Sequence, residues 1–353
     1  MKIPTRTEPI LVGVPTPDGT RSRNEFLDVT KGFLIFLVVY GHVIQYIGYN
    51  NTGFLVDPVF KGIYLFHMPP FMAISGYVSF NSIQKSSFFG LIGRRVQTLY
   101  FPVLFWSTLI ELSRITTGIA GHIGWSQAYE LLLIILSRTG RYWFIVVLFE
   151  SIVCVSFLKT IGFRTQTSLL AACLAAYLIP FQWLNSFKVI FPFFCLGYLL
   201  AGAGLPTFYK KPFFWPMLFL ACFPFHMWWD RYNPVILIEA NWESVCGVIF
   251  RTLCGLVSSA VALGGVWYAY KRIHSKVLIT FVALLGKNTL DIYIVHFSII
   301  NLLVAFPFPS KGTSAFSFTM APILALLITG LCISLALGVK HLPIIKKVFS
   351  AGR

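Results

Sequence analysis

FLDVTKGFLIFLVVYGHVIQ, the segment from Phe26 to Gln45, is an apolar run that contains three ionisable groups. His42 follows Lys31 by eleven residues, so on a straight helix the two side chains share one face, about 16 Å apart along the axis. Asp28 precedes Lys31 by three residues and can pair with it. Because ionisable groups are costly inside a bilayer, this stripe predicts a functional site at Asp28, Lys31 and His42.

The composition is that of a membrane protein. Of the 353 residues, 57% are hydrophobic and only 11% are charged, against about 25% charged in an ordinary soluble domain. The formal charge of +16 comes from basic residues scattered in short groups between apolar segments, so we do not expect nucleic acid as a partner. The seven cysteines stand singly, without a Cys-x-x-Cys pair, and predict neither a disulfide framework nor a metal site.

We predict an all-α polytopic membrane protein of about ten transmembrane helices, because a hydrocarbon core about 30 Å thick needs roughly 20 apolar residues per helix. The spans lie near 27–47, 59–80, 97–117, 142–160, 166–181, 188–204, 212–229, 246–270, 277–305 and 318–340. With both termini in the cytoplasm, 19 of the 28 Lys and Arg residues fall in inner segments, as the positive-inside rule requires. The predicted domains are a flexible tail (1–24), the transmembrane domain (25–342) and a short basic tail (343–353).

Three histidines, His42, His67 and His296, fall at comparable depth in this topology, and we expect them to meet in one cavity. A single membrane histidine can also be a hydrogen-bonded packing residue. The stripe shared with Lys31 favours function for His42, whereas both interpretations stay open for His67.

Two adjacent prolines, Pro69 and Pro70, must break or kink the second span. The carbonyl groups that the prolines free need partners, which a polar cavity could supply. The alternative is a kink that serves packing alone, with Gly76 permitting close helix approach.

A basic pair, Arg94 and Arg95, marks the cytoplasmic end of the third span. Such a pair can enforce topology or contact anionic lipid. It can equally bind a phosphorylated cofactor that arrives from the cytoplasm, because guanidinium groups match phosphate oxygens.

The ninth span carries a second polar stripe. Thr289, Tyr293 and His296 follow one another at spacings of four and three, while Lys287 and Asp291 are spaced for an i,i+4 pair. Charges at such depth must pair or line water. At the outer end of the fourth span, Arg141 precedes two aromatic residues that are typical interfacial anchors.

Together these motifs resemble the membrane acyltransferase-3 family, most closely its fucose 4-O-acetylase-like branch. The motifs that carry the resemblance are Leu27-Asp28-x-x-Lys31-Gly32, Val38-Val-x-Gly41-His42, Phe66-His67-Met-Pro69, Ser75-Gly76-Tyr77, Tyr142-Trp143-Phe144 and Asn288-Thr-Leu-x-Ile-Tyr293-x-x-His296. They cover nearly the whole membrane domain in the expected order.

The resemblance implies a multi-pass enzyme of the bacterial inner membrane that moves acetyl from cytoplasmic acetyl-CoA, without a metal, to a sugar hydroxyl. The acceptor would be a surface polysaccharide, such as O-antigen or exopolysaccharide, or its lipid-linked precursor, and membrane lipid would surround the enzyme. In such families the histidine that matches His42 is essential, and the cation that matches Lys31 supports it. Arg95 matches the first arginine of the family's Arg-x-x-Arg motif, but Thr98 occupies the second position.

On this basis the predicted site has three parts. The catalytic residues are Asp28, Lys31 and His42, and the cofactor-binding residues are Arg94 and Arg95. The substrate-binding residues are His67, Ser75, Arg141, Tyr293 and His296.

Two mechanisms and two other functions stay open. Neutral His42 could remove the proton from the attacking hydroxyl, or it could carry the acetyl group covalently. Broken helices and buried ionisable residues also occur in transporters and flippases for acyl or glycan-lipid substrates, but we see neither a paired repeat nor a matching broken helix in the second half. A non-catalytic scaffold gives no reason to keep Lys31 and His42 on one face.

The sequence has no Gly-rich phosphate loop, His-Glu-x-x-His pattern or Gly-x-Ser-x-Gly elbow, which excludes the soluble enzymes that use them.

Overall fold

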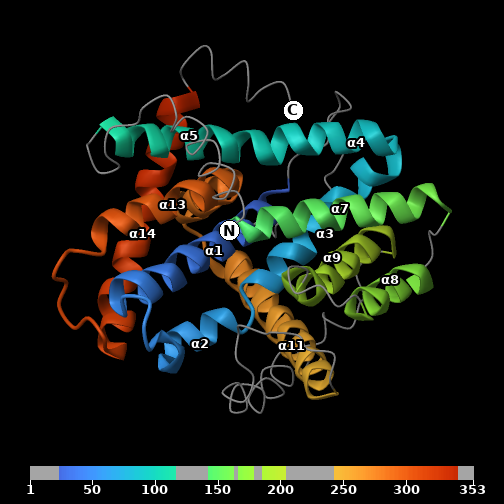
Figure 1. Ribbon diagram of the computed structural model, residues 1–353. Helices are drawn as coiled ribbons and strands as arrows, with labels where there is room; N and C mark the ends of the chain where they lie inside the picture. Colours follow the sequence, from blue (N-terminus) through green and yellow to red (C-terminus); the bar gives the residue numbers. More distant parts are fainter. Residues whose placement is uncertain (1–23, 117–141, 163–165, 179–184, 204–241, 341–353) are drawn as a thin grey trace, which may run out of the picture.

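The computed structural model describes residues 24–116, 142–162, 166–178, 185–203 and 242–340 (Figure 1). Every regular element among them is a helix, which confirms the all-α prediction. The α-helices are α1 (Glu25–His42), α2 (Pro58–Tyr64), α3 (Met68–Lys85), α4 (Phe88–Arg95), α5 (Phe101–Thr116), α7 (Trp143–Thr160), α8 (Gln166–Leu178), α9 (Asn185–Ala203), α11 (Trp242–Arg272), α12 (Lys276–Lys287), α13 (Thr289–Leu303) and α14 (Ser314–Lys340). Two π-helical turns, η1 (Val43–Gly48) and η3 (Val96–Tyr100), and one 3₁₀ turn, η2 (Phe54–Val56), join them.

Five helical segments of the described chain are long and apolar enough to cross a membrane. They are Glu25–Gly48, Trp143–Thr160, Asn185–Ala203, Ile249–Arg272 and Ser314–Val339. A sixth is formed by α12 and α13 if this bent pair counts as one span. The count of ten and the cytoplasmic termini stay predictions; the span near 212–229 and the two tails, except Asn24, lie outside the described residues.

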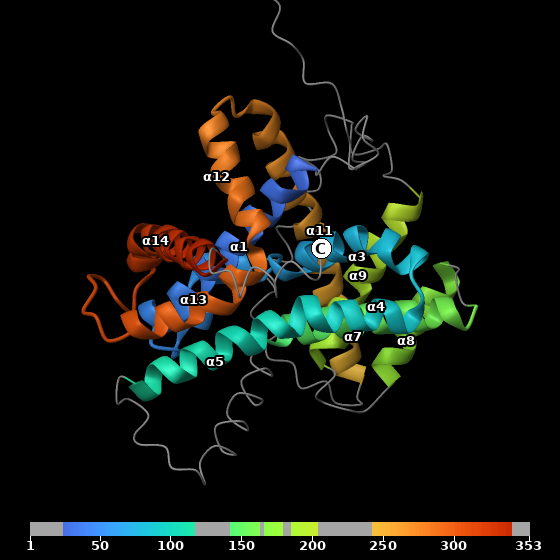
Figure 2. The same ribbon diagram turned by 90° about the horizontal axis from the view of Figure 1, so that it is seen from above.

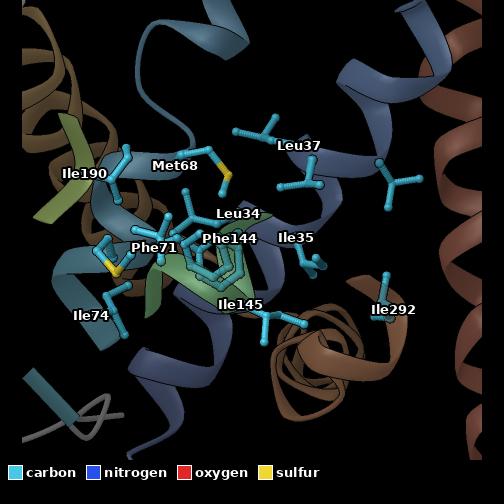
Figure 3. Close-up of a cluster of buried hydrophobic side chains, with 14 of the residues drawn as sticks. Leu34, Ile35, Leu37, Met68, Phe71, Ile74, Phe144, Ile145, Ile190 and Ile292 are labelled. Atoms are coloured by element: carbon cyan, nitrogen blue, oxygen red, sulfur yellow. The ribbon is translucent and has the colours of Figure 1, made fainter. Parts of the chain in front are cut away.

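Helix α1 lies at the centre of the molecule and is the most buried of these spans. It begins after Asn24, whose side chain accepts a hydrogen bond from the Leu27 amide, as an N-cap residue does. Side chains from α3, α7, α9 and α13 surround its apolar residues in one core (Figure 3). Figures 1 and 2 show α1 running between α13 and α14 on one side and α3 on the other. The segment from Phe26 to Gln45 therefore forms the central helix, against which the surrounding helices pack.

The predicted span near 59–80 is wrong as a single helix. The chain leaves α2 after Tyr64 and enters α3 at Met68, so Pro69 and Pro70 stand in the first turn of the second helix. Proline is tolerated there because the first amides of a helix have no intrahelical acceptor. The break that the prolines predict is confirmed, and His67 lies within it.

The predicted span near 277–305 is also interrupted, and α12 meets α13 at an angle of 83°. No proline causes this bend. The Asn288 side chain donates to the Leu284 carbonyl at 2.9 Å, which caps α12, while the Asn288 carbonyl accepts from the Ile292 amide and starts α13. Lys287 and Asp291 therefore stand on different helices, so the expected i,i+4 geometry is wrong. The second half also contains a broken helix, contrary to our prediction.

Close backbone contacts join α1 to α12. Gly32 of α1 faces the carbonyl of Val282, and Gly286 of α12 faces the carbonyl of Asp28. A Cβ atom on either glycine would overlap the opposing carbonyl oxygen. Small residues let membrane helices approach in this way, and here they fix the backbone at Asp28.

The same reciprocal arrangement joins α3 to α9. Gly76 faces the carbonyl of Phe194, and Gly197 faces the carbonyl of Ala73, again with no room for a Cβ atom. The interpretation of Gly76 as a close-packing residue is therefore confirmed.

Substituting Gly286 with alanine is expected to lower the apparent melting temperature, measured in detergent. Alanine normally stabilises a helix interior by about 0.5–1 kcal/mol relative to glycine, but here the added methyl group must push α1 away from α12, which costs about 1–3 kcal/mol. Gly338→Ala on α14 is the matched control, since a Cβ there meets no atom within 4 Å. A Gly286→Ala variant as stable as that control would contradict the contact.

Candidate active site

His42 is the last residue of α1, where the helix passes into the π-helical turn η1. Such turns are frequent at functional sites. Its ring packs edge-on against His296, with ring centroids 5.1 Å apart, and lies 5.9 Å from the rings of Tyr46 and Phe297. The buried Nδ1 atom of His42 has no hydrogen-bond partner among the described residues. Packing therefore holds the His42 ring in place and leaves its Nδ1 atom available for proton transfer or ligand binding.

Two cavities adjoin His42. The one that we call the α9 cavity has a volume of about 460 Å³, and its lining includes His67, Asn185, Ser186, Arg251 and Gly255. The other, the α5 cavity, has a volume of about 510 Å³, and its lining includes Ser107, Ile110, His296, Ser298 and Asn301. Five residues line both cavities: His42, Gln45, Tyr64, Trp143 and Tyr293. The three histidines therefore do not share one cavity as predicted; His42 stands in the wall between two.

Each of the other two histidines is held by the backbone carbonyl of the residue four positions earlier in the chain. The Nδ1 atom of His67 lies 2.9 Å from the Ile63 carbonyl, and that of His296 lies 2.9 Å from the Ile292 carbonyl. Since a carbonyl oxygen only accepts, Nδ1 carries the proton and Nε2 of a neutral ring has a free lone pair. The buried Nε2 atom of His296 has no hydrogen-bond partner among the described residues. Each cavity thus contains a second imidazole whose orientation is fixed.

Asp28 and Lys31 form an ion pair, with Lys31 Nζ 2.9 Å from Asp28 Oδ1. Asp28 is almost fully buried, with 2% of its side chain exposed, whereas 22% of the Lys31 side chain is exposed. Neither residue lines the cavities beside His42. The pair that the sequence predicts is confirmed, but its catalytic role stays a prediction.

Arg94 and Arg95 lie against the C-terminal end of α3. Arg95 Nη2 donates to the Ser82 hydroxyl at 2.8 Å, and Arg94 donates to the hydroxyl of Ser86. From α7, Lys159 Nζ donates to the carbonyls of Ile83 and Gln84 at 2.7 Å each. These three cations form what we call the basic cluster: Arg94, Arg95 and Lys159. Cations suit this place because the last carbonyls of a helix are partly negative and lack intrahelical donors.

Arg95 is the more enclosed of the two arginines. Burial, together with the neighbouring charge of Arg94, lowers its pKa from the usual value. Its buried Nε atom has no hydrogen-bond partner among the described residues. Thr98, which replaces the second arginine of the family motif, instead places its hydroxyl 3.5 Å from the Arg95 carbonyl.

With this geometry established, comparison with known proteins identifies the family. Residues 24–339 match the family model described as "Acyltransferase domain". The chain belongs to the acyltransferase-3 family. Membership, together with the apolar helices, makes it a multi-pass membrane acyltransferase and decides against the transporter and scaffold alternatives.

Two relatives of this acyltransferase both bear the name Nodulation protein NolL. The protein from Mesorhizobium japonicum is 31% identical over 346 residues, which cover 94% of this chain and 91% of the relative. The protein from Sinorhizobium fredii is 31% identical over 303 residues, which cover 80% of each chain. No solved structure matches the acyltransferase significantly.

The remaining predicted substrate residues have different surroundings. Tyr293 lines both cavities, with its ring centroid 6.0 Å from that of His296. The Ser75 hydroxyl donates to the Phe71 carbonyl within α3 at 2.9 Å, and Ser75 lines neither cavity. Arg141 lies outside the described residues. Among the described residues, no three His, Cys, Asp or Glu side chains could hold a metal ion.

Sequence reasoning missed several residues that line the acyltransferase cavities: Gln45, Tyr64, Ser107, Asn185, Arg251 and Asn301. Arg251 had a usable signal, because a cation inside an apolar span indicates a functional site. Lys159 of the basic cluster was considered only as one of the 19 positive charges in the predicted inner segments. The neutral residues had no comparable signal, since uncharged polar side chains are common in membrane helices.

Proposed function

We propose that this acyltransferase is an O-acetyltransferase of the bacterial inner membrane. It moves acetyl from cytoplasmic acetyl-CoA to a sugar hydroxyl of a surface polysaccharide or its lipid-linked precursor. The observation that carries the proposal is the position of His42 in the wall between two cavities. A transferase must bring a donor and an acceptor to one catalytic group, and this position makes His42 accessible from two sides.

The chemistry assigned to His42 is general base catalysis. Neutral His42 takes the proton of the acceptor hydroxyl as its oxygen forms a bond to the acetyl carbonyl carbon. The carbon–sulfur bond of the thioester then breaks, and the proton passes from His42 to the departing thiolate. The products are a sugar acetyl ester and the free thiol. His67 and His296, fixed by their backbone contacts, offer lone pairs that orient hydroxyl groups in the two cavities.

The donor is assigned to the α5 cavity because a helical path connects it to the basic cluster. The chain is helical from Phe88 through η3 to the end of α5. Ser107, which lines the α5 cavity, follows Arg95 by twelve residues, or about 18 Å along a helix. Arg94, Arg95 and Lys159 would hold the phosphates of the donor, and the unpartnered Nε atom of Arg95 fits a phosphate oxygen. The acceptor then occupies the α9 cavity.

The proposal is tested by measuring ester-linked acetyl on surface glycan. Cells with the wild-type gene and cells without it are grown on ¹³C-labelled acetate, and their glycan is treated with mild base. Mass spectrometry should find labelled acetate released only from cells that carry the gene. Purified enzyme in liposomes should also release CoA thiol from acetyl-CoA only when acceptor is present. Surface glycan without ester-linked acetyl in wild-type cells would contradict the proposal.

Arg95→Gln is expected to raise the KM for acetyl-CoA at least about tenfold, with a smaller change in kcat. Loss of a charge-assisted hydrogen bond to phosphate costs about 1.5–3 kcal/mol, and 1.4 kcal/mol corresponds to a tenfold change. Lys85→Gln is the control, because Lys85 is an exposed cation at the same end of α3. An equal rise of KM in both variants would reduce the role of Arg95 to general surface charge.

A further inference from the structure

An apolar groove runs along α11 between α1, α2 and α12. Its volume is about 490 Å³, and its lining includes Phe33, Gly62, Val261, Ala262, Gly265 and Ala269. Along α11 the lining extends from Ser258 to Tyr270, which is about 18 Å of helix. Helix α11 is the least buried of the five candidate spans, and the groove residues Ile273 and Leu278 are exposed.

The groove lies next to the α9 cavity. Leu65, at the end of α2, lines both. On α11, Ser258 lines the groove and Gly255 lines the cavity, three residues or one helical turn away. The two spaces are therefore adjacent, and a molecule that extends past Leu65 and Gly255 would reach from one to the other.

Polarity changes along this path. Arg251 lines the α9 cavity about one turn beyond Gly255, on the same face of α11. None of the described residues that line this cavity is acidic. His42 lines the same cavity. Along α11 the lining thus changes from apolar residues beside the groove to a cation in the cavity that His42 also lines.

We propose that the groove holds the hydrocarbon tail of a lipid-linked glycan acceptor, whose phosphate linkage lies at Arg251 and whose sugar extends to His42. This inference rests on the proposed function and selects the lipid-linked precursor over the finished polysaccharide. A guanidinium group suits a phosphodiester because its N–H groups match two phosphate oxygens. A bilayer lipid in the groove gains the same apolar contacts, but it places no sugar beside His42.

The test compares one glycan with and without its lipid. The full-length protein is reconstituted in phosphatidylcholine liposomes with [1-¹⁴C]acetyl-CoA. One acceptor is the chloroform–methanol lipid extract of the source cells, and the other is the water-soluble glycan that mild acid releases from that extract. We expect the lipid extract to be labelled at least about tenfold faster at equal glycan concentration, because the tail adds apolar contacts. Mild acid should then convert the labelled product into water-soluble acetylated glycan.

Two variants locate the effect on α11. Gly265 lines the groove and a Cβ atom there would meet no atom within 4 Å, so Gly265→Leu places a larger side chain at the groove. It should slow labelling of the lipid extract about tenfold, whereas Gly338→Leu, equally open but on α14, should not. Arg251→Gln should also slow labelling of the lipid extract, with a smaller effect on the free glycan.

Each contrary result has a distinct meaning. Equal labelling of both acceptors, with Gly265→Leu behaving like Gly338→Leu, would overturn the groove assignment and leave the proposed function intact. A labelled lipid that resists mild acid would overturn the phosphate linkage. If the wild type labels neither acceptor, the proposed function fails and this inference fails with it.

Discussion

His42→Ala is expected to lower the rate of acetyl transfer at least about a hundredfold while leaving the KM for acetyl-CoA within about threefold. A positioned general base contributes roughly 10²–10⁴ in rate, and the assigned donor phosphates lie in the basic cluster, far from His42. The measurement is initial rate against acetyl-CoA concentration, with the enzyme in liposomes and its amount matched by immunoblot.

Two controls separate catalysis from folding. His42→Gln keeps a side chain of similar size in the wall between the cavities and should be equally inactive. His274→Ala removes an exposed histidine between α11 and α12 and should retain full activity. A His42→Gln variant with near-normal rates would show that packing by His42, and not its basicity, is what transfer requires.

Lys31→Met is expected to destabilise the protein by about 3 kcal/mol, because it removes the cation that lies 2.9 Å from the buried Asp28 carboxylate. The methionine keeps the unbranched apolar stem, so lost packing contributes little. The measurement is the apparent melting temperature in detergent.

The double variant Asp28→Asn, Lys31→Met tests whether the buried Asp28 charge causes the loss of stability. Removing both charges also eliminates the buried negative charge, so most of the lost stability should return. A double variant as unstable as Lys31→Met would mean that the methionine itself disturbs α1. Any loss of activity that persists at restored stability measures what the charges of Asp28 and Lys31 together contribute beyond stability, which is the catalytic part of the prediction.

The sequence was sufficient for features that arise within one helix. The ion pair of Asp28 and Lys31 follows from spacing along one helix, whereas the end of α1 at His42 was not predicted. The break before Pro69 follows from the missing amide of proline.

Features that arise between helices could not be predicted. The bend at Asn288 depends on which carbonyl its side chain meets, and asparagine occurs in many straight helices. Lys159 caps α3 from about 75 positions away in the chain, a contact that no local pattern encodes. The division of the site into two cavities depends on how Tyr64, Trp143 and Tyr293 pack around His42.

The reciprocal glycine contacts have a mechanical consequence. Helices whose carbonyls lie directly over glycines cannot slide along each other without overlap, so α1 with α12 and α3 with α9 each behave as a stiff two-helix beam. The α9 cavity is lined by residues of both beams: His42 belongs to one, and Asn185 and Met68 belong to the other. If the acceptor occupies the α9 cavity as proposed, we expect it to enter between the two beams, and a covalent cross-link between α1 and α3 should then slow transfer without touching any reacting atom.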